Sequence, residues 1–85
     1  MTIRYTSRFA REAKKVPPHL RPLVEARVEL FRNNPFDPRL KTHKLTGALK
    51  GFYSFSIDYT VRVIFEFVEK NTALLHSIGD HSIYD

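Results

Sequence analysis

The 85-residue sequence contains no cysteine and only three glycines. Without cysteine, neither a disulfide framework nor a thiolate metal site can form, and nothing requires an oxidising compartment. With so few glycines, the chain has no glycine-rich phosphate-binding loop. No apolar run is long enough for a membrane span or a signal peptide. These absences predict the cytoplasm as the location, and we expect no membrane partner.

The remaining composition is that of a folded chain. Hydrophobic residues make up 42% of the sequence and aromatic residues 13%, which is too apolar for a disordered protein. Residues 1–85 show no internal repeat, linker or low-complexity tract. We therefore predict a single domain with a modest core.

Positive charge is concentrated in the first part of the chain. The net charge is +5, with 12 Lys/Arg against 4 Asp/Glu in residues 1–50 and 2 against 5 in residues 51–85. Such a basic half attracts a polyanion: nucleic acid, an anionic membrane or an acidic protein. A basic surface that serves only solubility is the alternative, but the asymmetry favours a polyanionic partner.

Two helices are predicted in the N-terminal half. Ser7 has the side chain of an N-cap residue, and the apolar residues after it recur at helical spacing. This helix should stop at Pro17-Pro18, and Pro18 can open a second helix. The second helix should end at Asn33-Asn34-Pro35, and Arg27 alone interrupts its apolar stripe. The stripe consists of Leu20, Leu23, Val24, Val28 and Phe31.

Residues 2–6, 52–57 and 61–67 alternate between apolar and polar residues in the manner of strands, and residues 72–78 form a further strand-like run. Short polar turns separate the last three, which favours antiparallel pairing. The element order is thus β-α-α-β-β-β. We predict an α+β fold in which the helical hairpin packs on the apolar face of an antiparallel sheet. The other face should be open to solvent or a ligand, and it carries Ser54, Ser56, Arg62 and Glu66.

The segment from Arg39 to Gly51 connects the two halves and is predicted to be a loop. It contains no acidic residue and no helical apolar period. A cationic loop that includes a histidine, held between ordered elements, suits phosphate binding and proton transfer. Its basic residues are Arg39, Lys41, Lys44 and Lys50, and its histidine is His43.

Arg62 interrupts an apolar strand between Val61 and Val63. A guanidinium group there is unfavourable unless it has a partner or points outward. Two interpretations stay open: a salt bridge, to Glu66 on the same strand face or to a neighbouring strand, or a fork of donors that holds a phosphate.

The histidines allow acid–base chemistry, because imidazole titrates near neutral pH. His43 and His81 are the candidates, although a single histidine is more often structural, as we interpret His19 and His76 to be. No spacing typical of a metal site is present, so neither a metal nor a cofactor is expected. Tyr84 either stacks on a nucleobase or covers the edge of the core.

Several segments together carry a resemblance. Their order along nearly the whole chain resembles the RelE/ParE superfamily of bacterial type II toxins, nearest the RelE and YafQ-like messenger RNA interferases. The segments are NPFDP (34–38), HKLTG (43–47), KGFYSFSI (50–57), VRVIFEF (61–67) and IGDHSIY (78–84). The resemblance implies a RelE-like fold and a toxin that cuts messenger RNA in the ribosomal A site without a metal.

The resemblance also implies roles for individual residues. His43 matches the loop histidine of the YafQ-like branch, and Arg62 matches an arginine that contacts the scissile phosphate. His81 matches a catalytic histidine, and Tyr84 an aromatic residue that stacks on the substrate base. Arg39, Lys41, Lys44 and Lys50 would hold the backbone of the messenger or of 16S ribosomal RNA.

The sequence departs from the YafQ-like pattern at two positions. Ser56 and Thr60 stand where that branch has a further histidine and an aspartate, and neither is a general base at neutral pH. The spacing from His81 to Tyr84 is also one residue shorter than the commoner pattern. The acid–base assignment therefore stays open, whereas the phosphate contact of Arg62 does not depend on these residues.

Partners and alternative functions follow from the same resemblance. A small cognate antitoxin is expected to cover the basic surface with an acidic or amphipathic segment, as a dimer or a toxin–antitoxin hetero-oligomer. One alternative is a ParE-like, non-enzymatic inhibitor of DNA gyrase, which needs no catalytic histidine. Another is a catalytically inactive homologue that acts only with its antitoxin.

Overall fold

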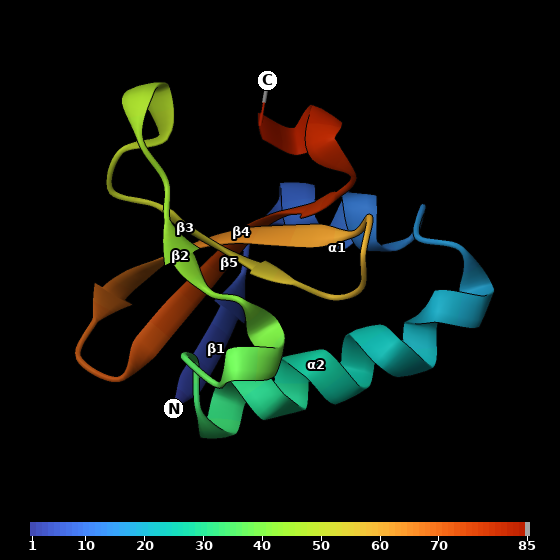
Figure 1. The fold of residues 1–85 in the computed structure, drawn as a ribbon, viewed down its shortest axis with the longest axis horizontal. Helices are drawn as coiled ribbons and strands as arrows, with labels where there is room; N and C mark the ends of the chain where they lie inside the picture. Colours follow the sequence, from blue (N-terminus) through green and yellow to red (C-terminus); the bar gives the residue numbers. More distant parts are fainter. Residues whose placement is uncertain (85) are drawn as a thin grey trace.

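The computed structural model describes residues 1–84 and shows one mixed β-sheet with two α-helices (Figure 1). The strands follow the order β1-β5-β4-β3-β2 across the sheet. The α-helices and strands are β1 (Thr2–Tyr5), α1 (Ser7–Ala13), α2 (Arg21–Asn33), β2 (His43–Lys44), β3 (Tyr53–Ser56), β4 (Arg62–Glu69) and β5 (Thr72–Gly79). Short 3₁₀ helices are η1 (Pro18–Leu20), η2 (Pro38–Leu40), η3 (Gly47–Leu49) and η4 (His81–Tyr84).

The predicted α+β class is confirmed, with one difference in the sheet. Strands β2 to β5 pair antiparallel, but β1 lies parallel to β5, with Thr2 opposite Thr72. The local pattern of β1 could not reveal this pairing, because its partner lies about seventy residues further along the chain.

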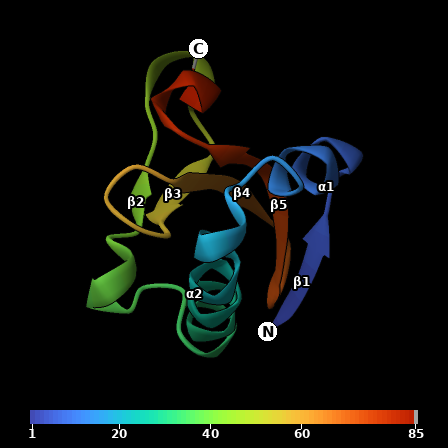
Figure 2. The same ribbon diagram turned by 90° about the vertical axis from the view of Figure 1, so that its right-hand side faces the viewer.

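Helix α2 covers one face of the sheet, and the C-terminal helix η4 lies on the other side (Figure 2). Phe31 of α2 stacks on Phe55 of β3 at 4.6 Å between ring centroids and meets Phe65 of β4 edge-on at 4.7 Å. All three rings are fully buried. The predicted apolar stripe of α2 thus forms the centre of the core. Arg27, which interrupts the stripe, donates from Nε to the Ile57 carbonyl at 3.3 Å.

Helix α1 packs against β5, and polar contacts fix this junction. Thr6, rather than the predicted Ser7, caps the helix: its Oγ1 accepts from the Phe9 amide at 3.0 Å. The same hydroxyl donates to the His76 carbonyl in β5 at 3.0 Å. Near the end of the helix, Glu12 Oε1 accepts hydrogen bonds from Ser77 Oγ at 2.6 Å and from the Ile78 amide at 3.3 Å.

The connection after α2 is more ordered than the predicted loop. Leu40 in η2 is fully buried in the core. His43 and Lys44 form β2, which pairs with Ser54 and Tyr53 of β3. A strand this short has no periodicity of its own, so only its partner strand defines it.

Candidate functional site

The polar face of the sheet is built from cross-strand neighbours. In an antiparallel pair, residues directly opposite each other point to the same face. His43 of β2 lies opposite Ser54 of β3, and Ser54 lies opposite Ile64 of β4. The next row contains Ser56 opposite Arg62. His43 and Arg62 therefore occupy adjacent rows of one face, the face away from α2.

Helix η4 covers part of this face. Tyr84 reaches the sheet with its hydroxyl, which lies 2.6 Å from the hydroxyl of the fully buried Ser54. Ile83 is buried beside Gly79, and a Cβ at Gly79 would lie only 2.7 Å from Ile83 Cγ2. Glycine at this position therefore allows η4 to fold back over the sheet. The Asp80 carboxylate accepts from the Ser82 amide at 2.9 Å and starts the turn.

Arg62 is held by two oxygens at the start of β4. Its Nη1 donates to Ser56 Oγ and to the Asp58 carbonyl, both at 2.7 Å. The salt bridge to Glu66 considered from the sequence is wrong, because Glu66 pairs with His76. Arg62 is only partly buried. The two hydrogen bonds from Nη1 nevertheless fix the position of its guanidinium group.

The two departures from the YafQ-like pattern support this arrangement. Ser56 accepts from Arg62, and Thr60 donates from its amide to Asp58 Oδ1 at 2.9 Å in the turn before β4. The hydrogen bond from the Val61 amide holds the pKa of the Asp58 carboxyl below its ordinary value, and the Thr60 contacts and the charge of Arg62 act in the same direction. Ser56 and Thr60 here orient the arginine and its turn.

His43 is exposed, and its ring is anchored at one nitrogen. Nδ1 lies 3.0 Å from the Lys41 carbonyl. Since a carbonyl only accepts, Nδ1 carries the hydrogen in this contact, and Nε2 of the neutral ring is left as an acceptor. Lys41 adopts the left-handed region with φ 53°, which turns its carbonyl to this position.

The structure brings together all four residues that the sequence analysis singled out for chemistry. His81 is exposed on η4, with its ring centroid 5.9 Å from that of Tyr84. Tyr84 contacts Ser54, the cross-strand partner of His43, and Arg62 occupies the neighbouring row. The four residues thus lie on the same side of the sheet and come from β2, β4 and η4.

The basic residues predicted to hold RNA are placed differently from one another. Arg39 is paired with Asp37 through Nε at 3.0 Å and Nη2 at 2.9 Å. These hydrogen bonds lower the pKa of Asp37 to about 2. Because such surface pairs are weak, Arg39 can still exchange its partner for phosphate. Lys41, Lys44 and Lys50 are exposed, and the last two line a hollow of about 480 Å³ beside Phe52.

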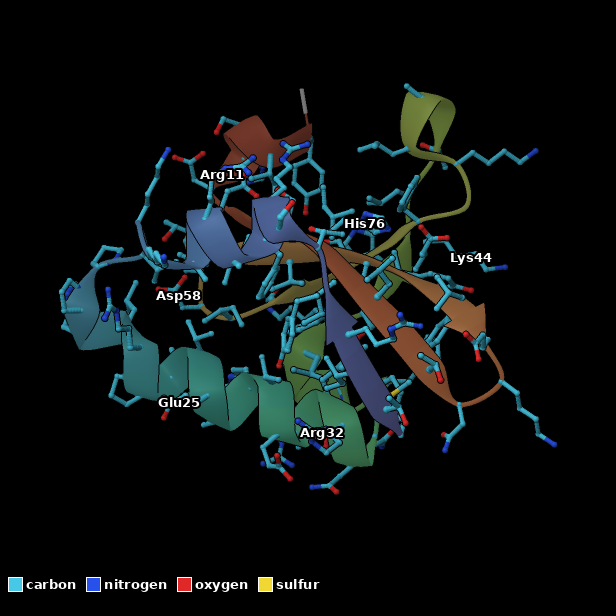
Figure 3. All side chains as sticks on the ribbon, turned by 180° about the vertical axis from the view of Figure 1, so that it is seen from behind. Arg11, Glu25, Arg32, Lys44, Asp58 and His76 are labelled. Carbon is cyan, nitrogen blue, oxygen red and sulfur yellow. The ribbon has the colours of Figure 1, made fainter. Side chains whose placement is uncertain are left out.

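One pair on this face was missed. His76, which the sequence analysis treated as structural, places Nε2 2.5 Å from Glu66 Oε2 and packs its ring against Phe52 at 5.1 Å. Figure 3 shows His76 between η4 and the β2–β3 hairpin, on the side away from α2. Alternation along β5 could not predict this, because the register between β4 and β5 shifts at this point.

This chain is similar to known proteins in its three-dimensional structure, whereas comparison of its sequence found no match. No protein-family model matches the chain, and no curated protein does. YafQ from Escherichia coli BL21(DE3), also solved in complex with DinJ, superposes with a TM-score of 0.80 at 19% identity, over 96% of this chain and 94% of its own. A YoeB/ParE toxin from Agrobacterium tumefaciens gives 0.77 at 14% identity, over 95% and 99%. A metal-bound toxin from Helicobacter pylori gives 0.72 at 25% identity, over 100% and 99%.

These matches cover nearly the full length of both partners, so the chain has the fold of the RelE/YafQ-like toxins, as the resemblance implied. Within residues 1–84, no three His, Asp or Glu side chains gather closely enough to hold a metal ion. None of the helices in the same range has the length and apolar character needed to cross a membrane.

Proposed function

We propose that the chain is the toxin of a type II toxin–antitoxin system and cleaves messenger RNA on the ribosome. The observation that carries the proposal is the convergence of His43, Arg62, His81 and Tyr84 on one face of a RelE/YafQ-like fold. A cation fixed in position and two imidazoles can promote RNA cleavage without a metal, and an aromatic ring can support a base beside the cleaved bond.

The groups divide the chemistry as follows. His43 Nε2, left as an acceptor by the Lys41 carbonyl, takes the proton of a ribose 2′-hydroxyl. The 2′-oxygen attacks the adjacent phosphorus, and the bond to the 5′-oxygen breaks. His81 supplies the proton to that leaving oxygen, and a 2′,3′-cyclic phosphate remains. Arg62 stabilises the charge that grows on the phosphate, and Tyr84 supports a base next to the bond.

The basic N-terminal half supplies the surface for the partners. Exposed Lys41, Lys44 and Lys50 surround the hairpin beside the site and suit the backbone of messenger or 16S ribosomal RNA. YafQ is known in a complex with DinJ, and we infer a cognate antitoxin for this chain, within a hetero-oligomer in the cytoplasm. An acidic segment of that antitoxin would compete with RNA for the same cations.

The test is controlled expression in a bacterium with the 5′ ends of messenger RNA mapped by primer extension. The proposal predicts growth arrest and cuts in register with codons. It also predicts that Arg62→Ala and His81→Ala remove both effects while each variant remains folded. Toxicity that survives in both folded variants would show that this face is not the active site.

The sequence resemblance to the RelE/ParE superfamily supports a second candidate, ParE-like inhibition of DNA gyrase without catalysis. This function needs no acid–base pair, so it leaves His43 and His81 unused. Growth arrest with DNA damage and intact messenger RNA, unchanged in His81→Ala, would favour it over the nuclease.

A further inference from the structure

The pair of Glu66 and His76 lies on the polar face but outside the four residues assigned to cleavage. Glu66 is four residues beyond Arg62 on β4, a separation of about 13 Å at the rise of a β-strand. The Arg62 guanidinium also turns the other way, toward Ser56 and the Asp58 carbonyl. The two groups therefore cannot act on the same phosphate.

A β-bulge places His76 in this position. Consecutive residues Ile64 and Phe65 of β4 lie opposite Ser77 and Leu75 of β5, so His76 is the extra residue. A bulge of this kind re-aims a side chain, and bulges are frequent next to active sites. Here it directs the imidazole to Glu66 and to the ring of Phe52.

Helix α1 fixes the backbone of the bulge on both sides. Thr6 Oγ1 donates to the His76 carbonyl, and Glu12 accepts from Ser77 Oγ and from the Ile78 amide. The first contact involves the backbone carbonyl of His76, the other two involve Ser77 and Ile78, and none involves the imidazole ring. The fold thus holds the bulge independently of the side chain at position 76, which indicates that the imidazole itself is not needed to form it.

Phe52, Glu66 and His76 can make different kinds of contact with a ligand. The His76 and Glu66 side chains are 29% and 33% exposed, and they restrain each other through Nε2 and Oε2. This leaves Glu66 Oε1 as an acceptor, because only Oε2 contacts the imidazole. Phe52 lies between the pair and the hollow lined by Lys44 and Lys50. An aromatic surface, a carboxylate acceptor and nearby cations are the components of a nucleobase subsite.

We propose that Phe52, Glu66 and His76 bind a nucleobase of the RNA next to the cleaved bond and select one with an exocyclic amino group. A carboxylate accepts from such a group in adenine or cytosine, whereas uracil has a carbonyl at the equivalent position. This subsite rests on the proposed RNA-cleaving function and adds sequence preference to it. Phe52 and Glu66 lie two residues along their strands from the cross-strand row of His43, Ser54 and Ile64. A nucleotide next to the one held at His43 would reach this position.

The test uses the intact ¹³C,¹⁵N-labelled chain, titrated with 2′-O-methyl trinucleotides U-X-U in which X is adenine, cytosine or uracil. Methylation removes the nucleophile, so binding is measured without cleavage. The proposal predicts shifts of the His76 ring and the Glu66 amide, and affinity roughly tenfold higher for adenine or cytosine than for uracil. Glu66→Gln should abolish this preference, whereas Glu69→Gln on the same strand should retain it.

Equal affinity for the three trinucleotides, or shifts confined to the surroundings of Arg62, would overturn the subsite and leave the cleavage proposal standing. Chemical-shift changes at His76, together with no cleavage of unmodified messenger RNA by the same preparation, would refute the proposed nuclease activity. Nucleobase binding at Phe52, Glu66 and His76 would then still stand. A chain whose spectrum no trinucleotide changes would contradict the subsite outright. His76→Asn, which leaves the backbone bulge intact, should weaken binding without unfolding the chain.

Discussion

The two faces of the β-sheet are covered in opposite ways. On the face toward α2, apolar residues of β3, β4 and β5 are completely buried, with Phe55, Phe65 and Leu75 among them. On the other face, polar side chains alternate with these, and η4 covers part of the face through Ile83 and the Tyr84–Ser54 hydrogen bond. The comparison teaches that one face supplies the stability of the domain, so the other is free to carry charged and titratable groups.

The largest expected effect is on the buried face. Phe31→Ala removes a ring that touches both Phe55 and Phe65, and should lower the free energy of unfolding by about 3–5 kcal/mol. Arg62→Ala on the polar face should change it far less, because the guanidinium group is only partly buried. Urea denaturation followed by circular dichroism measures both; equal losses would contradict the division of roles between the faces.

The next effect concerns the cover of the polar face. Gly79→Ala places a methyl group against Ile83 Cγ2, which should destabilise the chain by about 1–3 kcal/mol and displace η4. RNA cleavage should fall with it, since His81 and Tyr84 move together. In the double variant with Ile83→Ala the two losses should be less than additive. Strict additivity would show that the contact is absent.

Glu12→Gln tests how α1 holds the bulged strand. Although burial raises the pKa of Glu12, hydrogen bonds from Ser77 and the Ile78 amide and the charge of Arg8 outweigh it, so the pKa lies below its ordinary value of 4.5. The substitution should lower the free energy of unfolding by about 1–2 kcal/mol at pH 7.

The pH dependence has a definite sign. Because the folded-state pKa of Glu12 is lowered, its stabilisation is complete above the ordinary value of 4.5 and disappears as the pH falls through the folded-state pKa. Wild type and Glu12→Gln should therefore converge in stability below pH 4.5. Curves that stay parallel down to acid would mean that the carboxylate charge does not contribute.

Tyr84→Phe should have a smaller effect, about 1 kcal/mol, by leaving the buried Ser54 hydroxyl without the tyrosine oxygen. Tyr59→Phe is the matched control, because Tyr59 is 90% exposed and should show no change. Thermal denaturation of the two variants side by side would decide; equal melting temperatures would argue that η4 does not depend on this hydrogen bond.

The smallest expected effect on stability belongs to the exposed lysines. Lys44→Ala should change the free energy of unfolding by less than about 0.5 kcal/mol. It should, however, reduce the slope of RNA affinity against salt concentration by about one, as expected for one lost phosphate contact. Lys70→Ala, in the turn between β4 and β5, should leave that slope unchanged when binding is measured by fluorescence anisotropy.

The sequence was sufficient for those features that depend on local pattern. Alternation in residues 52–57 and 61–67 predicted most of the side chains that face the core, although Phe67 is 37% exposed and Ile64 is buried. The stripe of α2 predicted Phe31 inside the core. Prolines and asparagines marked the helix ends within a few residues. These signals are written in neighbouring residues, so no tertiary information was needed.

What the sequence could not supply depends on distant pairing. The parallel position of β1, the short strand at His43 and the bulge at His76 each exist only because another strand defines them. Likewise, the sequence left open whether Glu66 pairs with Arg62, and only the pairing of Glu66 with His76 on β5 rules this out. The chemistry of their side chains and the family resemblance were enough to select His43, Arg62, His81 and Tyr84 as candidates. Only the strand register shows that His43 and Arg62 lie on the same face of the sheet.

The most direct test of the central claim is cleavage by the purified chain in a reconstituted translation reaction with one defined messenger. The account predicts codon-registered cuts by the wild type, and none by Arg62→Ala although its free energy of unfolding changes little. Such a result would show that the polar face acts on RNA and contributes little to stability. An intact messenger with the folded wild-type chain, or equal cutting by the folded Arg62→Ala variant, would contradict it.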